Sequence, residues 1–126
     1  MKRTLLLLSL VGFIATAELA SPVAQAKDIT GSWEMTTYSP EGTRVNTMVI
    51  RKDGDKLKAI AKGPNGERDY DSVEVQGSQV TIVLTIDYQG TPMIITYSGV
   101  IDKDGMHGNA DFGGLAQGTW AAVPTN

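Results

Sequence analysis

Short runs of alternating apolar and polar residues, separated by turn residues, constrain the fold of this chain more than any other feature. From Ile29 onward, Gly, Pro, Asn and Asp interrupt such runs about every 10 to 12 residues. No segment places apolar residues at helical spacing over three turns. The pattern is typical of an all-β meander and predicts eight strands, at residues 29–38, 44–51, 56–61, 68–75, 79–88, 93–101, 106–112 and 118–123.

The connections between these strands are short and suited to tight hairpins. Asp53-Gly54 and Asp104-Gly105 tolerate the positive φ that such turns require. Short loops join antiparallel neighbours, so we expect an up-and-down sheet that closes into an eight-stranded barrel. The first and last strands carry similar triplets for pairing where the barrel closes, Gly31-Ser32-Trp33 and Gly118-Thr119-Trp120. An open β-sandwich built from the same strands is the alternative.

The alternation also predicts which side chains point into the core. In the strand at 79–88, the apolar set at even positions opposes Thr81, Thr85 and Asp87. In the strand at 106–112, the set that starts at Met106 opposes His107 and Asp111. The apolar sets must point inward because the opposite sets carry the charges. The strand at 44–51 declares no face, since its three apolar residues Met48, Val49 and Ile50 are consecutive.

The N-terminus has the features of a cleavable signal peptide at residues 1–26. Lys2 and Arg3 precede an apolar run of about signal-peptide length, shorter than the roughly 20 residues of a membrane span. Ala24-Gln25-Ala26 matches the small-x-small site that signal peptidase cleaves. We therefore expect one exported domain at 27–126, periplasmic or extracellular and without a membrane span. An uncleaved N-terminal anchor is the rival interpretation.

Composition excludes some classes of protein. The chain contains no cysteine, so no disulfide framework supports the exported domain, and its stability must come from its hydrophobic core or from an assembly. The formal net charge is −3, and basic residues alternate with acidic ones, as in the run 51–56. A nucleic-acid partner requires a clustered basic face, which this sequence lacks.

The triplet Gly31-Ser32-Trp33 at the start of the first strand resembles the Gly-x-Trp signature of the calycin group, which includes lipocalins and avidin-like barrels. Residues 29–122 are similar to a widespread, mostly uncharacterised kind of exported bacterial lipocalin-like domain. That resemblance rests on the runs 53–57 (DGDKL) and 111–114 (DFGG), and on Gly118-Thr119-Trp120. It implies a β-barrel and no particular activity. Lipocalins are longer and end with a helix, which is absent after Trp120.

Four inward aromatic residues are the candidate ligand-binding residues: Trp33, Tyr97, Phe112 and Trp120. An eight-stranded barrel is just filled by its side chains or holds one small ligand. The same aromatic residues therefore either line a pocket or fill the core, and both interpretations stay open.

No catalytic or metal-binding group stands out. His107 is the single histidine, so no histidine triad or zinc cluster is possible, and its register places it on the solvent face. Asp102-x-Asp104-Gly105 resembles the start of a calcium loop but lacks the later ligands of an EF-hand. The sequence assigns no cofactor, metal or catalytic residue.

Two classes of function remain. The first is a binding module that holds a small apolar or amphipathic molecule in its barrel or rim. The second is a structural or protein-interaction domain with a filled core and no ligand. An enzyme ranks third, because the sequence forces no pair of titratable residues together inside the barrel.

Overall fold

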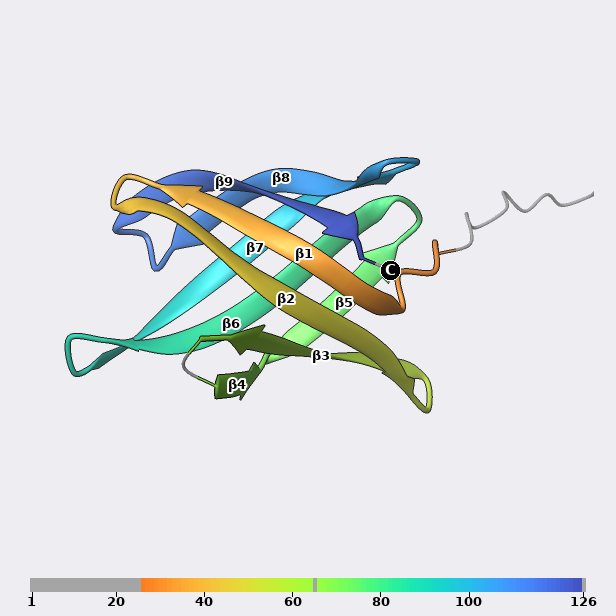
Figure 1. The fold of residues 1–126 in the computed structure, drawn as a ribbon, viewed down its shortest axis with the longest axis horizontal. Helices are drawn as coiled ribbons and strands as arrows, with labels where there is room; N and C mark the ends of the chain where they lie inside the picture. Colours follow the sequence, from red (N-terminus) through yellow and green to blue (C-terminus); the bar gives the residue numbers. More distant parts are fainter. Residues whose placement is uncertain (1–25, 65, 126) are drawn as a thin grey trace, which may run out of the picture.

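The computed structural model describes residues 26–64 and 66–125 (Figure 1). The predicted signal peptide lies outside the described residues except for Ala26. The described chain folds into nine strands: β1 (Gly31–Ser39), β2 (Gly42–Asp53), β3 (Lys56–Gly63), β4 (Gly66–Asp69), β5 (Ser72–Gln76), β6 (Gln79–Tyr88), β7 (Thr91–Asp102), β8 (Gly105–Phe112) and β9 (Ala116–Pro124). The all-β prediction is confirmed.

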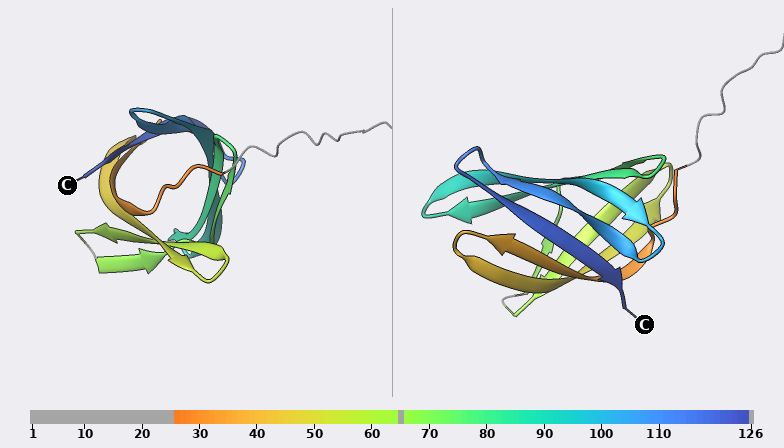
Figure 2. Two further views of the ribbon diagram at one scale, coloured as in Figure 1. Left: turned by 90° about the vertical axis from the view of Figure 1, so that its right-hand side faces the viewer. Right: turned by 90° about the horizontal axis from the view of Figure 1, so that it is seen from above.

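All nine strands belong to one antiparallel sheet that curls into a half-barrel (Figure 2). The strand order is β4-β3-β2-β1-β9-β8-β7-β6-β5, so a single sheet replaces the two layers of the sandwich alternative. No helix in the described ranges is long and apolar enough to cross a membrane.

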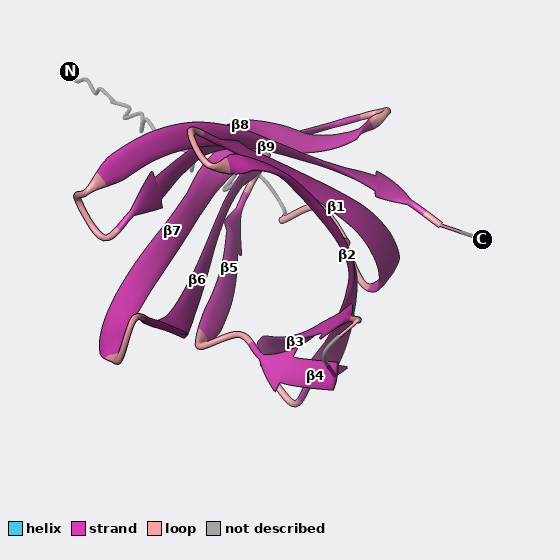
Figure 3. Ribbon diagram, turned by 60° about the vertical axis from the view of Figure 1, so that its left-hand side comes forward, coloured by secondary structure: helices cyan, strands magenta, loops and turns pink. Residues whose placement is uncertain are grey.

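The first and last strands pair, as the sequence predicts: β1 forms an antiparallel ladder with β9. The two similar triplets do not face each other, however. Trp33 lies opposite Pro124, and Trp120 lies opposite Thr37. The borders of the sheet lie elsewhere, at β4 and β5 (Figure 3).

The predicted strand at 68–75 is divided into β4 and β5, and this accounts for the difference between eight and nine strands. β4 pairs with β3, whereas β5 pairs with β6. Asp71 and Ser72 both face Val83, because the Asp71 N–H donates to its carbonyl oxygen at 2.7 Å and Ser72 is its ladder partner. Two residues against one is the arrangement of a β-bulge, which bends the strand and ends its pairing with β3.

The core lies on the concave face of the sheet. The predicted inward positions Met35, Ile82, Met106 and Trp120 are at most 2% exposed. Met48 and Ile50 fill the inner face of β2, which the sequence left undecided.

The chain before β1 closes one end of the half-barrel. The segment 26–30 crosses this end, as the left view of Figure 2 shows, and the Lys27 N–H donates to the Gly77 carbonyl at 3.1 Å. Ile29 from this segment is 1% exposed. The indole N–H of Trp33 donates to the carbonyl of Ile29 at 2.9 Å, which fixes the segment against β1.

Candidate functional site

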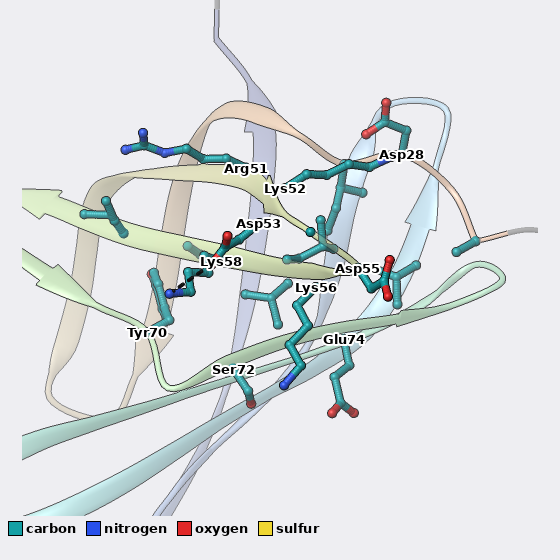
Figure 4. A pocket seen from close by; sticks show the side chains of 18 of the residues that line it. Asp28, Arg51, Lys52, Asp53, Asp55, Lys56, Lys58, Tyr70, Ser72 and Glu74 are labelled. Atoms are coloured by element: carbon teal, nitrogen blue, oxygen red, sulfur yellow. Dashed lines mark ion pairs between the residues drawn. The ribbon is translucent and has the colours of Figure 1, made fainter.

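A cleft of about 1380 Å³ separates the β2–β3 hairpin from β5 (Figure 4). We call it the seam cleft, because it lies where the two border regions of the sheet approach each other. Its β3 lip is residues 56–58 and its β5 lip is residues 72–76. The segment 26–29 adjoins both lips at one end.

The bulge after Tyr70 opens this cleft. The Tyr70 N–H donates to the Ala59 carbonyl at 2.9 Å, which extends the pairing of β4 with β3 by one step. From Asp71 onward the main chain hydrogen-bonds to β6 instead of β3, beginning with the Asp71 N–H and the Val83 carbonyl. Among the described residues, the β3 lip consequently has no ladder partner on the side that faces β5.

The floor of the seam cleft is apolar. Leu57, Val73 and Val75 come from the two lips, and Ile29 comes from the N-terminal segment. Ile29 and Val73 belong to the core, whereas Leu57 and Val75 are partly buried and pack against it. Burial of an apolar ligand group here would thus extend the existing core.

The rim of the cleft carries charges of both signs, and on the β2–β3 side Asp53 and Asp55 accompany the lysines. Lys56 and Lys58 lie on the β3 lip, and Lys58 Nζ lies 3.2 Å from Asp53 Oδ2. Asp71 and Glu74 lie on the opposite side, in and beside β5. Figure 4 shows Lys56 extending from the β3 lip toward the side of Ser72 and Glu74. An occupant with a polar or charged group would meet partners of either sign at this rim.

Asp28 stabilises the N-terminal segment beside the cleft. Its Oδ1 accepts the backbone N–H of Thr30 at 2.9 Å and the Thr30 hydroxyl at 2.8 Å. These hydrogen bonds, the backbone one first, lower the pKa of Asp28, and the charge of Lys52 lowers it further. The carboxylate thus remains ionised and fixes the local conformation of residues 28–30.

Tyr70 lines the cleft and reaches from it to Met35 in the core. Its ring is 7% exposed, and its hydroxyl donates to Met35 Sδ at 3.4 Å. Burial raises the pKa of Tyr70 to about 12, although a hydrogen bond with Asn46 lowers it in part. Tyr70 is therefore a neutral phenol that anchors the bulge.

The aromatic residues predicted to bind a ligand lie in or against the core. Tyr97 and Trp120 meet edge to face, with ring centroids 5.9 Å apart. Trp33 contacts Ile29 through its indole N–H, whereas Phe112 is partly buried against the core cluster. The structure thus brings Tyr97 and Trp120 together, and none of the four residues lines the seam cleft. Their role in ligand binding stays a prediction.

His107 and Asp102 form a structural pair near the β7–β8 turn. His107 Nε2 lies 3.3 Å from Asp102 Oδ2, and both side chains are exposed. Asp102 Oδ1 accepts the N–H groups of Asp104 and Gly105, and the bond from Asp104 is the main cause of its lowered pKa. Asp102 therefore stabilises the β7–β8 turn. Within residues 26–64 and 66–125, no three His, Cys, Asp or Glu side chains gather in a group that could hold a metal ion.

Sequence reasoning missed the seam cleft, although the sequence carries a signal for it. Along 68–75 the inward apolar positions are Tyr70, Val73 and Val75, and the first interval is three residues instead of two. A change of parity within one strand indicates a bulge. The three-residue interval between Tyr70 and Val73 therefore indicates the bulge beside the cleft. The prediction of one unbroken strand at 68–75 ignored this interval.

No protein-family model matches this chain, and no curated protein is detectably similar to it in sequence.

Proposed function

We propose that this chain is an exported, non-catalytic binding module that holds a small amphipathic molecule in the seam cleft. One observation carries the proposal: a cleft of about 1380 Å³ combines an apolar floor with a charged rim. Small-molecule sites are typically clefts of about 300 to 1,000 Å³ with mostly apolar linings and a few polar groups. The seam cleft is larger than this range, and it shares the apolar floor and the polar groups of such a site.

The amphipathic class is favoured over a purely apolar ligand. Leu57 and Val75 offer partly exposed apolar surface at the floor. Lys56 and Glu74 stand above them on opposite lips. An apolar group would gain burial on the floor, and a polar group would keep hydrogen bonds at the rim, where its desolvation costs less.

A matched pair of substitutions tests the site. Val75→Asp places a charge on the floor, whereas Val123→Asp introduces the same change at a 47% exposed position of β9 outside the cleft. Titration with anilinonaphthalene sulfonate should show at least about tenfold weaker binding for Val75→Asp, which corresponds to 1.4 kcal/mol. Binding to Val123→Asp should stay within about twofold of the parent value. Equal binding by both variants would remove the seam cleft as the site.

A structural or protein-interaction domain without a ligand is the second candidate. The packed interior favours it, because Met35, Ile82 and Ala110 are 0% exposed. Native mass spectrometry of protein isolated from its own compartment separates the two candidates. A retained small molecule supports the binding module, and ligand-free oligomers or a co-isolated protein support the second.

We also propose that the domain is of the lipocalin-like, calycin type and is exported by a bacterium. Two features support this: Trp33 lies at the start of β1, and Ile29 fills the same end of the half-barrel. A Gly-x-Trp triplet at a closed barrel end is the calycin arrangement that the sequence resembles.

A further inference from the structure

The two lips of the seam cleft turn toward each other main-chain groups that have no ladder partner within residues 26–64 and 66–125. Residues that flank a two-residue turn form a hydrogen-bonded pair, and such pairs alternate along an antiparallel ladder. Asp53 and Lys56 flank the β2–β3 turn, so the amide and carbonyl of Leu57 point away from β2. Gln76 and Gln79 flank the β5–β6 turn, so the corresponding groups of Val73 and Val75 point away from β6. Both sets point toward the cleft.

The hydrogen bond between Tyr70 and Ala59 sets the register in which β5 could pair directly with β3. Tyr70 N donates to Ala59 O, and this bond is the step before the cleft begins. On β3, Leu57 lies two residues before Ala59, in the direction of the cleft. Three residues farther along the other strand lies Val73, because the bulge inserts one extra residue. Continued pairing therefore sets Leu57 opposite Val73 and Lys56 opposite Glu74.

The side chains agree with this register on both faces. Leu57 and Val73 are apolar and belong to the inner face, where cross-strand apolar pairs stabilise a sheet. Lys56 and Glu74 are exposed and of opposite charge, which favours them as an outer cross-strand pair. A one-residue slip would bring Lys56 opposite Val73 and lose both matches.

An inserted strand from another molecule fits less well than direct pairing. A strand between β3 and β5 would need its flanking strands about 9.6 Å apart, twice the usual spacing of about 4.8 Å. At Tyr70 and Ala59 the two sides are already within one hydrogen bond, 2.9 Å from N to O.

We propose that the seam cleft has a closed state, in which β5 pairs with β3 in the register Leu57–Val73 and Lys56–Glu74. Closure completes the barrel wall and covers the apolar floor. The β3–β5 seam is thus a gate. Its effect on a ligand rests on the proposed function, whereas the closed register itself does not.

Disulfide trapping in the full chain tests the closed state, because the chain contains no cysteine of its own. The variant Leu57→Cys/Val73→Cys places thiols in the proposed register. The variant Leu57→Cys/Val75→Cys shifts one thiol by two residues along the same lip. Under mild oxidation the first should form its disulfide at least tenfold faster than the second, measured by mass spectrometry after alkylation. Equal rates, or no bond in the first variant, would overturn the closed register.

A second pair guards against damage to the core, since Val73 is only 6% exposed. Lys56→Cys/Glu74→Cys uses exposed positions that also face each other in the closed register, and Lys56→Cys/Gln76→Cys is its shifted control. The same rate difference is expected, with circular dichroism confirming that each variant keeps its sheet. Slow bonding in both in-register pairs, with the fold intact, refutes the gate.

Measuring probe binding to the oxidised and reduced variant distinguishes failure of the gate from failure of the proposed site. Oxidised Leu57→Cys/Val73→Cys should bind anilinonaphthalene sulfonate at least tenfold more weakly than its reduced form. If the bond forms and probe binding is unchanged, the closed state stands, but neither the site nor its gating does. If no bond forms while Val75→Asp still weakens probe binding, the site stands and the gate does not.

Discussion

The indole N–H of Trp33 donates a hydrogen bond to the carbonyl oxygen of Ile29 at 2.9 Å, so the residue that begins the core of β1 also holds the segment preceding it. Both residues are buried, at 7% and 1% exposure. The closed end of the half-barrel thus depends on one side chain for packing and for satisfying a buried carbonyl.

Two substitutions at Trp33 separate these roles. Trp33→Ala removes the ring and should cost about 3 to 5 kcal/mol of unfolding free energy. Trp33→Phe keeps an aromatic ring but leaves the Ile29 carbonyl unpaired, so about 1 to 3 kcal/mol is expected. Urea unfolding followed by circular dichroism measures both. Equal losses would mean that the aromatic ring kept in Trp33→Phe adds nothing to stability, which would contradict the packing role.

Gly99 on β7 should not tolerate a side chain. A Cβ at this position would collide with the main-chain carbonyl of His107 on β8 and touch the Trp120 ring. Gly99→Ala is therefore expected to destabilise the domain by more than about 2 kcal/mol, as overpacking against backbone does.

Gly63→Ala is the matched control, because a Cβ there meets nothing within 4 Å. It should leave stability unchanged or raise it by up to about 1 kcal/mol. The melting temperatures of the two variants check the pair, and a stable Gly99→Ala domain would contradict the close approach of β7 and β8.

Tyr70 should make the domain sensitive to alkaline pH. Its folded pKa is raised to about 12 from the ordinary value of 10.0, so the native state keeps a proton that the unfolded chain loses. The resulting stability is fully present below pH 10 and disappears as pH rises through 12. At most about 3 kcal/mol is involved, since one pKa unit is worth 1.36 kcal/mol.

Tyr70→Phe tests this linkage, because it removes the titrating group and keeps the ring. Urea unfolding at several pH values between 9 and 12 should show a shallower loss of stability for the variant than for the parent. Burial raises the pKa of Tyr97 as well, so a remaining slope in the variant is expected. Identical slopes would show that Tyr70 ionises normally.

His107→Ala should change stability by no more than about 0.5 kcal/mol, as expected for a surface site. Its side chain is 58% exposed, and its contact is Asp102. Ligand binding should also be unaffected, because His107 does not line the seam cleft. Loss of a measured activity or of metal uptake in this variant would reopen the enzyme interpretation.

The mature protein should begin at Lys27. Signal peptidase cleavage after Ala24-Gln25-Ala26 predicts this end, and Edman sequencing of protein from the periplasm or medium reads it directly. Protein that begins at Met1, or that stays in the membrane fraction, would contradict the prediction.

Sequence periodicity sufficed for most of the sheet because most strands alternate regularly between core and solvent, the predicted strands at 44–51 and 68–75 excepted. Val80 and Met106 are buried, as their alternation predicts, and Gly54 and Gly105 have the positive φ predicted for their turns. The cleft escaped prediction because its cause is a single extra residue near Asp71, which alters the partner of a strand without ending its extended conformation. Pairing partners are long-range properties, and a local pattern does not report them.

The adjacency of β1 and β9 also determines the order in which the molecule can be assembled. Every other strand pair joins neighbours in sequence and forms within a hairpin, whereas β1 must await a partner that lies at the far end of the chain. Two local meanders, β1 to β4 and β5 to β9, can thus fold early, each with short loops to close. Their union through β1 and β9 is the step with the largest loop-closure entropy. A nascent chain that still lacks β9 would expose the edge of β1, and this exposure ends only when the nine residues of β9 have been added.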